Sequence, residues 1–493
     1  MESELIKIRK QKIEELRQNS INPYPYNYAR SHKTSNLIQS YSNLKAGDQT
    51  NDYVNIAGRI MSIRNLGKLS FLDLQDGYGK VQLLVKNDIP LVKYLDIGDH
   101  IGSYGNVFKT KKGELTINAG DLIMLCKSLR PLPEKWHGLK DPDLIYRNRS
   151  DYFATSLEVR KKFEIRSKAI QALKDFLNER EFLEVEIPIL QPVYGGASAR
   201  PFKTFLNALG KEYYLSISPE LYLKRLIAGG FERVYTVCKN FRNEGIDHSH
   251  NPEFTMMECY WSYADYNDMM NLTEELYESI FLKALGTTEV MYKISDNIEA
   301  KINFKKPWTR VSMLELVTLD TGINVSNLNI DGLRKTIEEK LYPEFEITLP
   351  KSELEKWCWG ELVVALFEHY SQNKLIQPTF VIDHPKETTP LCKIHRKDSR
   401  LIERFEPFVA GMEIGNAYSE LNDPIEQRRL FEEQADKREL GDELAHQLDE
   451  DFLKAIELGI PPTGGLGLGI DRMVMLLIGY NNIKDVLLFP LMK

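Results

Sequence analysis

The spacing of apolar residues divides the chain into stretches of different character. Residues 1–20 place Ile6, Ile13 and Leu16 on one side of a short predicted helix, which ends before the turn-rich sequence INPYPYN. From Tyr53 to about Cys126 the pattern changes to short alternating runs separated by glycine-containing turns, which predicts about five strands. So many strands in so short a stretch favour a small closed barrel of the OB type.

A helical pattern follows the linker PLPEKWHGLKDPD, with its apolar positions at 159, 163, 170, 173 and 177. The next run, FLEVEIPIL, is strand-like, and a helix near 264–284, a mixed segment to about 375 and a closing strand and helix come later. Because the elements do not alternate as βαβ units, we expect an α+β domain with an antiparallel sheet flanked by helices. The expected parts are an N-terminal helical extension (1–50), the all-β OB-fold barrel (51–130), a linker (131–157) and a large C-terminal domain (158–493) with an inserted segment at about 285–375.

Composition indicates a soluble globular protein. Hydrophobic residues make up 42% of the chain and charged residues 27%, and no apolar run reaches the roughly 18 residues that a membrane span needs. The N-terminal sequence MESELIKIRKQKIEELRQ lacks the apolar core of a signal peptide, so we expect a cytoplasmic protein without a membrane partner. The five cysteines are scattered without a CxxC pair, which favours buried thiols over a zinc site.

The net charge of −7 conceals an asymmetry along the chain. Residues 1–150 contain 23 Lys and Arg against 16 Asp and Glu, a charge of +7. The remaining residues contain 41 against 55, a charge of −14. A basic N-terminal part and an acidic C-terminal part suit a nucleic-acid-binding module joined to a part that attracts cations.

The first stretch with candidate chemistry is RNEGIDHSHNPEFTMMECY, which lies between two strand-like runs. Arg242 offers a planar fork to a phosphate, and Phe254 offers a face on which a purine can stack. Glu258 offers a charge partner for an ammonium group. The alternative is a surface hairpin of mixed charge, which composition alone does not exclude.

The second stretch, ERFEPFVAGMEIGNAYSELND, predicts a hairpin. If Ala410 and Gly411 form its turn, residue 408 pairs with 413, and Glu406 and Glu413 point to the same face of adjacent strands. Paired carboxylates attract a divalent cation, and Mg²⁺ is usually held by one or two carboxylates together with substrate phosphates. A solvated acidic face is the alternative.

The third stretch, PPTGGLGLGIDRMVMLLIGY, is a glycine-rich strand that runs into an apolar helix. It is not a Walker loop, because no GK[ST] follows the glycines. Small residues let a ligand approach the backbone, and Arg472 at this opening would meet a phosphate tail. Tight packing of a buried C-terminal helix accounts for the same glycines and is compatible with this interpretation.

Together these stretches resemble the three signature motifs of class II aminoacyl-tRNA synthetases: EVEIPIL with Pro188, FRNEG followed by EF, and GLGIDR. The sequences GGASARPF, ISPELYLKRLIAGGFERVY and EIGNAYSELND are similar to the lysyl-tRNA synthetases of this class, and the likeness covers nearly the whole chain. The resemblance implies a class II catalytic domain, an OB-fold anticodon-binding domain and a homodimer with Pro188 at the interface. It also implies that lysine and ATP form lysyl-adenylate and pyrophosphate, and that the lysyl group then passes to the 3′ end of tRNA(Lys).

The resemblance further implies a role for each matching residue. Arg242, Arg472 and Glu244 would act in catalysis, with the two arginines on the α-phosphate and the γ-phosphate end of ATP. The implied ATP-binding residues are Arg242, Glu244, His250, Asn251, Phe254, Glu406, Glu413 and Arg472, with Mg²⁺ on Glu406 and Glu413. The implied lysine-binding residues are Gly196, Glu220, Glu258, Tyr260, Asn416 and Glu420. The implied anticodon-binding residues are Arg64, Phe71, Gln82 and Glu114.

The amino acid must be chosen by the pocket, because aspartyl and asparaginyl synthetases share the barrel and the motifs. Lysine carries two ammonium groups, and burying either without a partner would be costly. Glu220 and Glu258 resemble the partners of the α-amino group, and Glu420 with Tyr260 and Asn416 resembles the ε-amino site. An aspartate pocket would instead present a cation, and Glu420 would repel the substrate.

The other alternative is a synthetase paralogue that acts as a binding protein and does not charge tRNA. Such a paralogue is expected to lack a motif residue or the barrel, whereas Arg242, Glu413, Arg472 and the barrel are present. One departure from the family pattern is Ser249, where relatives commonly carry an arginine; His248 is a candidate to replace that cation.

In the barrel, the run LSFLDLQ puts Phe71 on the same side as Asp73 and Gln75. An aromatic side chain on a polar face is typical of surfaces that stack single-stranded bases. The alternative is that Phe71 caps the barrel core.

Overall fold

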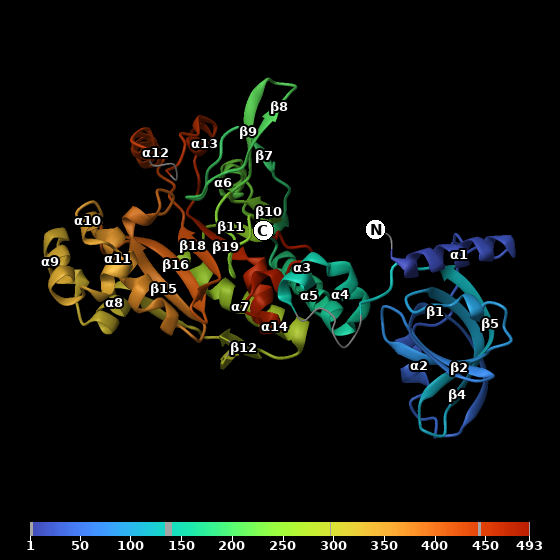
Figure 1. The fold of residues 1–493 in the computed structure, drawn as a ribbon. Coiled ribbons are helices and arrows are strands. Elements are labelled where there is room, and N and C mark those ends of the chain that lie inside the picture. The colour runs from blue at the N-terminus through green and yellow to red at the C-terminus, as the bar shows by residue number, and fades with distance from the viewer. Residues whose placement is uncertain (1–2, 134–140, 296, 442–444, 493) are drawn as a thin grey trace. The chain divides into compact units, whose positions relative to one another are not determined.

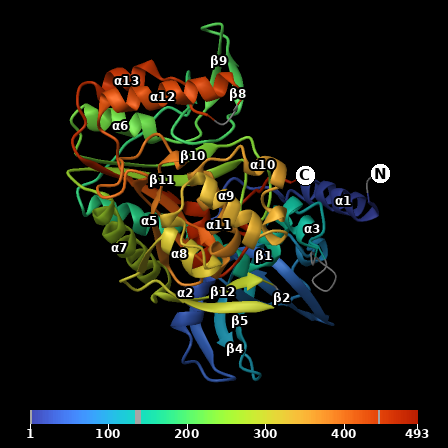
Figure 2. The same cartoon turned by 90° about the vertical axis from the view of Figure 1, so that its left-hand side faces the viewer.

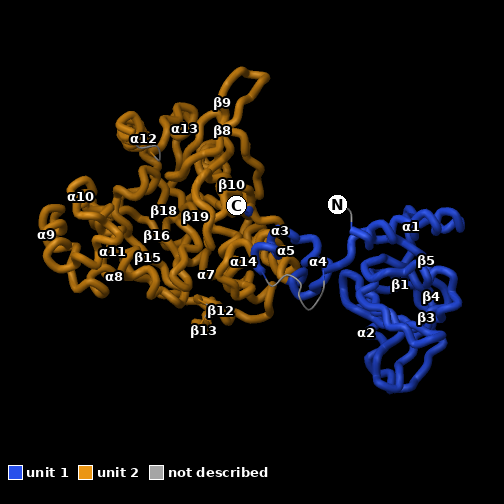
Figure 3. Tube along the Cα trace, viewed as in Figure 1, with its two compact units in different colours: residues 1–161, 492 blue, residues 162–491, 493 orange. Residues whose placement is uncertain are grey.

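The computed structural model describes residues 3–133, 141–295, 297–441 and 445–492 (Figure 1). The chain divides into two compact units, residues 1–161 and residues 162–491, which Figure 3 shows in different colours. Within the described residues, no helix has the length and apolar character needed to cross a membrane.

The first unit contains a closed barrel with the strand order β1-β2-β3-β5-β4, which confirms the predicted OB-type barrel. Inward and outward positions alternate along the strands: Leu72 and Leu74 of β2 are buried inside, whereas Phe71 and Asp73 lie outside and are half-buried. The predicted N-terminal helix is α1, which is capped by the Ser3 side chain. The elements of this unit are α1 (Glu4–Gln18), α2 (Thr34–Ser40), β1 (Gln49–Leu66), β2 (Leu69–Gln75), β3 (Lys80–Lys86), η1 (Val92–Tyr94), β4 (His100–Lys109), β5 (Leu115–Cys126), α3 (Pro142–Arg147) and α4 (Arg149–Thr155).

The second unit is built on a large sheet with the order β14-β15-β16-β18-β19-β11-β10-β6, in which β17 also pairs with β16. The central neighbours are antiparallel, as predicted, but β14 runs parallel to β15 and β6 runs parallel to β10 at the two edges. The sheet is therefore mixed at its edges. Its strands are β6 (Leu183–Glu184), β10 (Arg233–Phe241), β11 (Glu253–Ser262), β14 (Thr309–Ser312), β15 (Thr379–Pro385), β16 (Leu401–Val409), β17 (Met412–Glu413), β18 (Gly415–Ser419) and β19 (Thr463–Gly469).

The predicted strand over FLEVEIPIL is wrong in its extent. Only Leu183–Glu184 (β6) and Leu190–Gln191 (β7) are strands. Pro188 has no backbone N–H to donate to a ladder, so a continuous strand through this run would lose a hydrogen bond. β7 belongs to a small sheet with β8 (Lys203–Leu206) and β9 (Lys211–Leu215), and β12 (Glu289–Ser295) pairs only with β13 (Ile298–Asn303) among the described strands.

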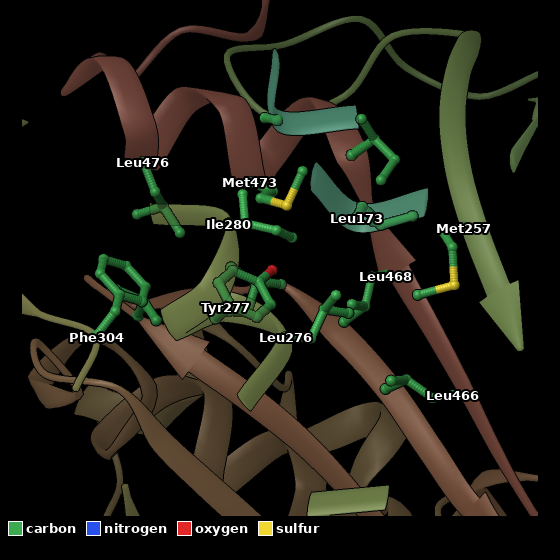
Figure 4. Packing of buried hydrophobic residues seen from close by; sticks show 14 of the residues in the cluster. Leu173, Met257, Leu276, Tyr277, Ile280, Phe304, Leu466, Leu468, Met473 and Leu476 are labelled. Carbon is green, nitrogen blue, oxygen red and sulfur yellow. The ribbon is translucent and has the colours of Figure 1, made fainter. Parts of the chain in front are cut away.

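Three helices bury the main core against one face of the large sheet. They are α5 (Leu157–Asn178), α7 (Tyr266–Leu285) and α14 (Ile470–Ile478), which confirm the predicted stripe at 159–177, the helix near 264–284 and the closing helix. Figure 4 shows Tyr277 and Ile280 of α7 and Met473 of α14 packed over Leu466 and Leu468 of β19. The glycine-rich strand β19 is therefore fixed by packing of these helices against one face of the sheet.

The segment 285–375 is built into the edge of the sheet, since β14 pairs with β15. Its helices α8 (Met313–Thr321), α9 (Ile330–Lys340) and α11 (Trp359–Tyr370) form a second core around Leu333, Leu362 and Phe367. The remaining short elements are η2 (Val325–Asn327), η3 (Glu344–Ile347), α10 (Lys351–Leu354), η4 (Gln372–Lys374), η5 (Lys386–Thr388) and η6 (Ile483–Asp485).

Helices α6 (Glu220–Ala228), α12 (Pro424–Glu439) and α13 (Glu450–Ile456) lie together in Figure 2. They share a buried cluster in which Leu223, Phe431 and Phe452 pack with Val234 of β10 and Tyr260 of β11. This packing fixes the first turn of α6 beside the strands that carry the predicted amino-acid site.

Candidate active site

The hairpin predicted from ERFEPFVAGMEIG is present. Ala410 and Gly411 have positive φ values of 53° and 74°, and Phe408 pairs with Glu413. Glu406 therefore points to the same face as Glu413, as expected. Glu406 forms an ion pair with Arg404, and Oε2 of Glu413 lies 3.1 Å from Nη1 of Arg472.

The glycines of β19 make room for the site. In the sheet register, Gly467 lies between Glu258 of β11 and Asn416 of β18, and Gly465 lies between Tyr260 and Tyr418. A Cβ atom on Gly465 would lie 2.7 Å from the ring of Tyr260 and would also collide with Glu420. The strand is therefore glycine-rich because larger residues would fill the space in front of the side chains on its two neighbours.

Two cavities open over these strands. The first is lined by residues of the predicted nucleotide site, namely Arg242, Glu244, His250, Asn251, Phe254, Glu413 and Arg472. The second is lined by all the predicted lysine-binding residues, namely Gly196, Glu220, Glu258, Tyr260, Asn416 and Glu420. Glu406 lines the second cavity, and Arg242, Glu413 and Asn416 line both. The two predicted sites therefore adjoin along one stretch of the sheet.

The first cavity combines an aromatic face with two arginines. The guanidinium carbon of Arg242 lies 5.1 Å from the centre of the Phe254 ring. Nη2 of Arg472 lies 3.2 Å from Nε2 of His250, so this nitrogen accepts a hydrogen bond and the His250 proton is on Nδ1. Nδ1 of His250 in turn lies 2.8 Å from Oδ2 of Asp247.

Ser249 stabilises the turn that presents His250. Its backbone N–H donates a hydrogen bond of 2.7 Å to Oδ1 of Asp247. Partial burial opposes ionisation of Asp247, but hydrogen bonds from Ser249 and His250 lower the pKa of this carboxyl to about 2. The suggestion that His248 replaces a cation at the nucleotide is not supported, because Nδ1 of His248 faces the Asn482 amide at 3.2 Å and the residue does not line the described part of the cavity.

The second cavity contains three carboxylates that are almost completely buried. Glu220, Glu258 and Glu420 are 5%, 4% and 2% exposed. Burial and the neighbouring Glu220 raise the pKa of Glu258 to about 8, although Ser218 and Tyr260 donate hydrogen bonds to it. Burial also raises the pKa of Glu420 to about 8 against the opposing effect of a nearby lysine, Lys224. Such a cavity strongly favours a cationic ligand.

Sequence reasoning missed three charged residues at this site. Arg404 lines the second cavity, and its Nε donates a hydrogen bond of 2.9 Å to Oδ1 of Asn416. Lys224 is buried beside Glu220, and Asp471 accepts the Thr255 N–H at 2.7 Å and pairs with Arg166. The alternation along ERFEPF could have revealed Arg404, because it lies two residues before Glu406 on the same face.

Glu406 and Glu413 are suited to hold a metal ion only if a bound phosphate or water supplies further ligands. Within the described residues, no group of three or more His, Cys, Asp or Glu side chains is arranged to hold a metal ion. Glu406 and Glu413 share one face of the hairpin and line the same cavity, which is a donor set for an ion that takes its other ligands from phosphates and water.

The barrel brings three of the four predicted anticodon-binding residues, Arg64, Phe71 and Gln82, to one face. Arg64 pairs with Phe71 across β1 and β2, with 6.0 Å from the guanidinium carbon to the ring centre. Gln82 of β3 is on the same face but is 8% exposed and accepts a hydrogen bond from Thr116. Glu114 is exposed, just before β5. Phe71 is therefore on the outside of the barrel and does not form part of its core.

Comparison with protein families agrees with both parts of this architecture. The family model for tRNA synthetases class II (D, K and N) matches residues 141–493. The model for the OB-fold nucleic acid binding domain matches residues 54–125.

Similar proteins cover the chain from end to end. Lysine–tRNA ligases of Pelotomaculum thermopropionicum and Carboxydothermus hydrogenoformans are 48% and 46% identical to it, and the matches span 100% of this chain and 95% and 98% of theirs. The lysine–tRNA ligase of Clostridium novyi is 49% identical over 99% of this chain and 94% of its own. The chain therefore belongs to the class II tRNA synthetases and, within that class, to the lysine–tRNA ligases.

Proposed function

We propose that the first cavity binds ATP, that the second binds lysine, and that the chain ligates lysine to tRNA(Lys) by way of lysyl-adenylate. The observation that carries this proposal is the group of three buried carboxylates, Glu220, Glu258 and Glu420, directly beside a cavity with two arginines. Buried carboxylates pair with the ammonium groups of lysine, and arginines pair with phosphates.

Arg242 lines both cavities, so it is suited to act where the two substrates meet. In the first step, a carboxylate oxygen of lysine attacks the α-phosphorus of ATP, and the bond to the β-phosphate breaks with its electron pair leaving on pyrophosphate. Negative charge builds on the α-phosphate, and Arg242 stabilises it. The main contribution of the protein is to hold the two reactants in line.

In the second step, the terminal ribose hydroxyl of tRNA attacks the acyl carbon of the adenylate, loses its proton and displaces AMP. Neither step needs a side-chain nucleophile. Arg472, Glu244, His250 and Asn251 would orient the nucleotide, and Phe254 would stack on the adenine.

Glu406 and Glu413 would hold Mg²⁺, with the phosphates of ATP and water as further ligands. The ion would neutralise phosphate charge during transfer. These two carboxylates pair with Arg404 and Arg472. Each arginine balances the negative charge of a carboxylate that the bound ion would neutralise.

The barrel and the first motif complete the proposal. Arg64, Phe71, Gln82 and Glu114 would contact the anticodon, so that residues 51–130 form the anticodon-binding domain and residues 158–493 the catalytic domain. A homodimer would form around Pro188, where the apolar side chains of Leu183, Ile189 and Leu190 are exposed. We also propose that the enzyme acts in the cytoplasm.

Aspartate or asparagine as the substrate is disfavoured by the pairing of Arg404, which lines the second cavity, and of Lys224, which lies behind it. Arg404 forms an ion pair with Glu406, and Lys224 forms ion pairs with Glu220 and Glu420. Neither cation is available to a substrate carboxylate, and Glu420 would repel one.

The test of the proposed function is ATP–pyrophosphate exchange driven by each amino acid, followed by charging of total tRNA. We expect exchange with lysine and charging of tRNA(Lys). Exchange driven by aspartate or asparagine, or lysine-dependent exchange without any charging, would refute the proposal.

A further inference from the structure

A charged side chain behind the second cavity has no role in the reaction described above. Lys224 lies one helical turn after Glu220 in α6, and its side chain is 1% exposed. Its ammonium nitrogen donates a hydrogen bond of 2.7 Å to Oε1 of Glu220 and forms an ion pair with Oε2 of Glu420. It also lies 3.4 Å from the carbonyl oxygen of Leu391.

The position of Lys224 relative to the cavity is informative. Glu220 and Glu420 line the cavity, whereas Lys224 is not among the described residues that line it. An ammonium group has three N–H donors, and the three acceptors around Lys224 match that number. Lys224 therefore contacts the two carboxylates from the side away from the cavity and does not occupy the cavity itself.

The charges of the cavity explain what this contact contributes. Three buried carboxyl groups in one cavity do not all ionise easily, because burial raises the pKa of each and the charge of Glu220 raises the pKa of Glu258 and Glu420 further. Lys224 adds one positive charge beside Glu220 and Glu420 and favours their ionised forms. The internal lysine therefore supports the two carboxylates that would pair with the ammonium groups of a bound lysine.

Other titratable and charged groups face this cluster from the surrounding elements. Burial and the charge of Lys224 lower the pKa of His446 to about 4, so this side chain stays neutral. Arg404 is already paired with Glu406. The groups that face the cluster are Arg242 after β10, Glu258 and Tyr260 of β11, Cys392 before β16, Arg404 of β16, Tyr418 of β18 and His446 before α13. Lys224 is thus the one cation among these described groups that contacts both Glu220 and Glu420.

We propose that Lys224 is a positioning residue for amino-acid selection: it fixes Glu220 and Glu420 in the orientation that receives the ammonium groups of lysine, and its charge favours their ionised forms. This inference rests on the proposed function, because it requires that these glutamates bind the substrate. It predicts that the contribution of Lys224 is specific to lysine and is absent for ATP.

The test compares Lys224→Met, which keeps the length of the side chain and removes its charge, with Lys224→Arg, which keeps the charge. Lys174→Met is the matched control, since it removes the partly exposed ion pair of Lys174 with Glu184. For each full-length protein, the measurements are thermal unfolding and the KM values for lysine and ATP in pyrophosphate exchange, with kcat/KM for lysine followed from pH 6 to 9.

We expect Lys224→Met to raise the KM for lysine roughly 50-fold, while the KM for ATP changes less than about threefold. The acidic limb of the pH profile should move up by about one pH unit, because carboxylates without their counter-ion ionise at higher pH. Lys224→Arg should retain the pH profile of the original protein with a KM for lysine raised only about fivefold, and Lys174→Met should change nothing.

Three results would overturn the inference. An unchanged KM for lysine in Lys224→Met would show that the carboxylates need no support, and a lower KM would show that Lys224 competes with the substrate. If Lys224→Met does not fold, a rise in the KM for ATP as large as that for lysine in Lys224→Arg would reduce the role of the residue to stability. Failure of the proposed function is a separate outcome, because the unmodified protein would then show no lysine-dependent exchange.

Discussion

The two cavities of the active site are organised in opposite ways. In the lysine cavity the key carboxylates are at most 5% exposed and are linked to one another through Lys224, Ser218 and Tyr260. In the nucleotide cavity the side chain of His250 is 55% exposed and that of Glu413 is 40% exposed. Under the proposed function, this difference means that the groups for amino-acid selection are already arranged by packing, whereas ATP would replace the ion pairs of the groups proposed to bind its phosphates.

The largest effect is expected where this buried network is cut. Glu420→Gln removes a charge that pairs with the ammonium of the substrate and leaves Lys224 with one carboxylate, so the KM for lysine should rise roughly 100-fold or more. The KM for ATP should change less than about threefold. Glu426→Gln, which removes a half-buried carboxylate of α12 that pairs with Arg429, is the control and should change neither value. An unchanged KM for lysine in Glu420→Gln would remove Glu420 from the lysine site.

The converse change tests the nucleotide cavity. Arg472→Lys replaces a planar fork by a point charge, and we expect the KM for ATP to rise roughly 30-fold. Lysine affinity, measured by calorimetry without ATP, should stay within about twofold, because Arg472 does not line the described part of the lysine cavity. If lysine affinity falls as much as ATP affinity, the two cavities are not independent and the comparison fails.

Proton release on binding of lysine is a further property that should characterise the lysine cavity. Burial and neighbouring charge raise the pKa values of Glu258 and Glu420 to about 8, so the protonated fraction of both groups grows below that pH. Lysine binds the cavity in which these carboxyl groups are ionised, so its binding releases a proton from them. Its Kd should therefore fall as pH rises from 6 to 8, by about tenfold per pH unit for one proton released, and level off above pH 8. Calorimetry in buffers of different ionisation enthalpy measures the released proton, and binding without pH dependence or proton release would contradict this prediction.

The smallest effect is expected on the barrel. Phe71→Ala should raise the KM for tRNA roughly tenfold, since one stacked base contributes about 1–3 kcal/mol. Pyrophosphate exchange, which does not involve tRNA, should be unchanged. Tyr104→Ala, which removes an exposed aromatic side chain from β4, is the matched control. Equal effects of the two substitutions would mean that Phe71 has no special place on the RNA-binding face.

Much of the fold could be predicted because the apolar spacing is strong where an element has one buried face. The alternation in LSFLDLQ gave the correct face of Phe71, and the apolar stripes gave α5 and α7. FLEVEIPIL failed because alternation is interrupted by Pro188, whose missing N–H matters more than the pattern. The parallel pairs at the sheet edges join segments far apart in the chain, which local spacing does not reveal.

The positions of candidate site residues could be predicted where they lie in a sequence motif. They could not be predicted where a residue reaches the site only through tertiary packing. Glu406 and Glu413 could be placed on one face from the turn at Ala410 and Gly411 alone. Lys224 could not be recognised, because a Glu and a Lys four residues apart on a helix usually form an exposed pair. Its burial beside both Glu220 and Glu420 depends on tertiary packing.

The central claim is that the carboxylates of the second cavity select lysine by its ammonium groups. The most direct test is to measure the affinity of the unmodified protein, without ATP, for lysine and for norleucine, which has the same length but no ε-ammonium. The account predicts that lysine binds at least about 100-fold more tightly, because norleucine leaves a buried carboxylate unpaired. Comparable affinities for the two amino acids would contradict it.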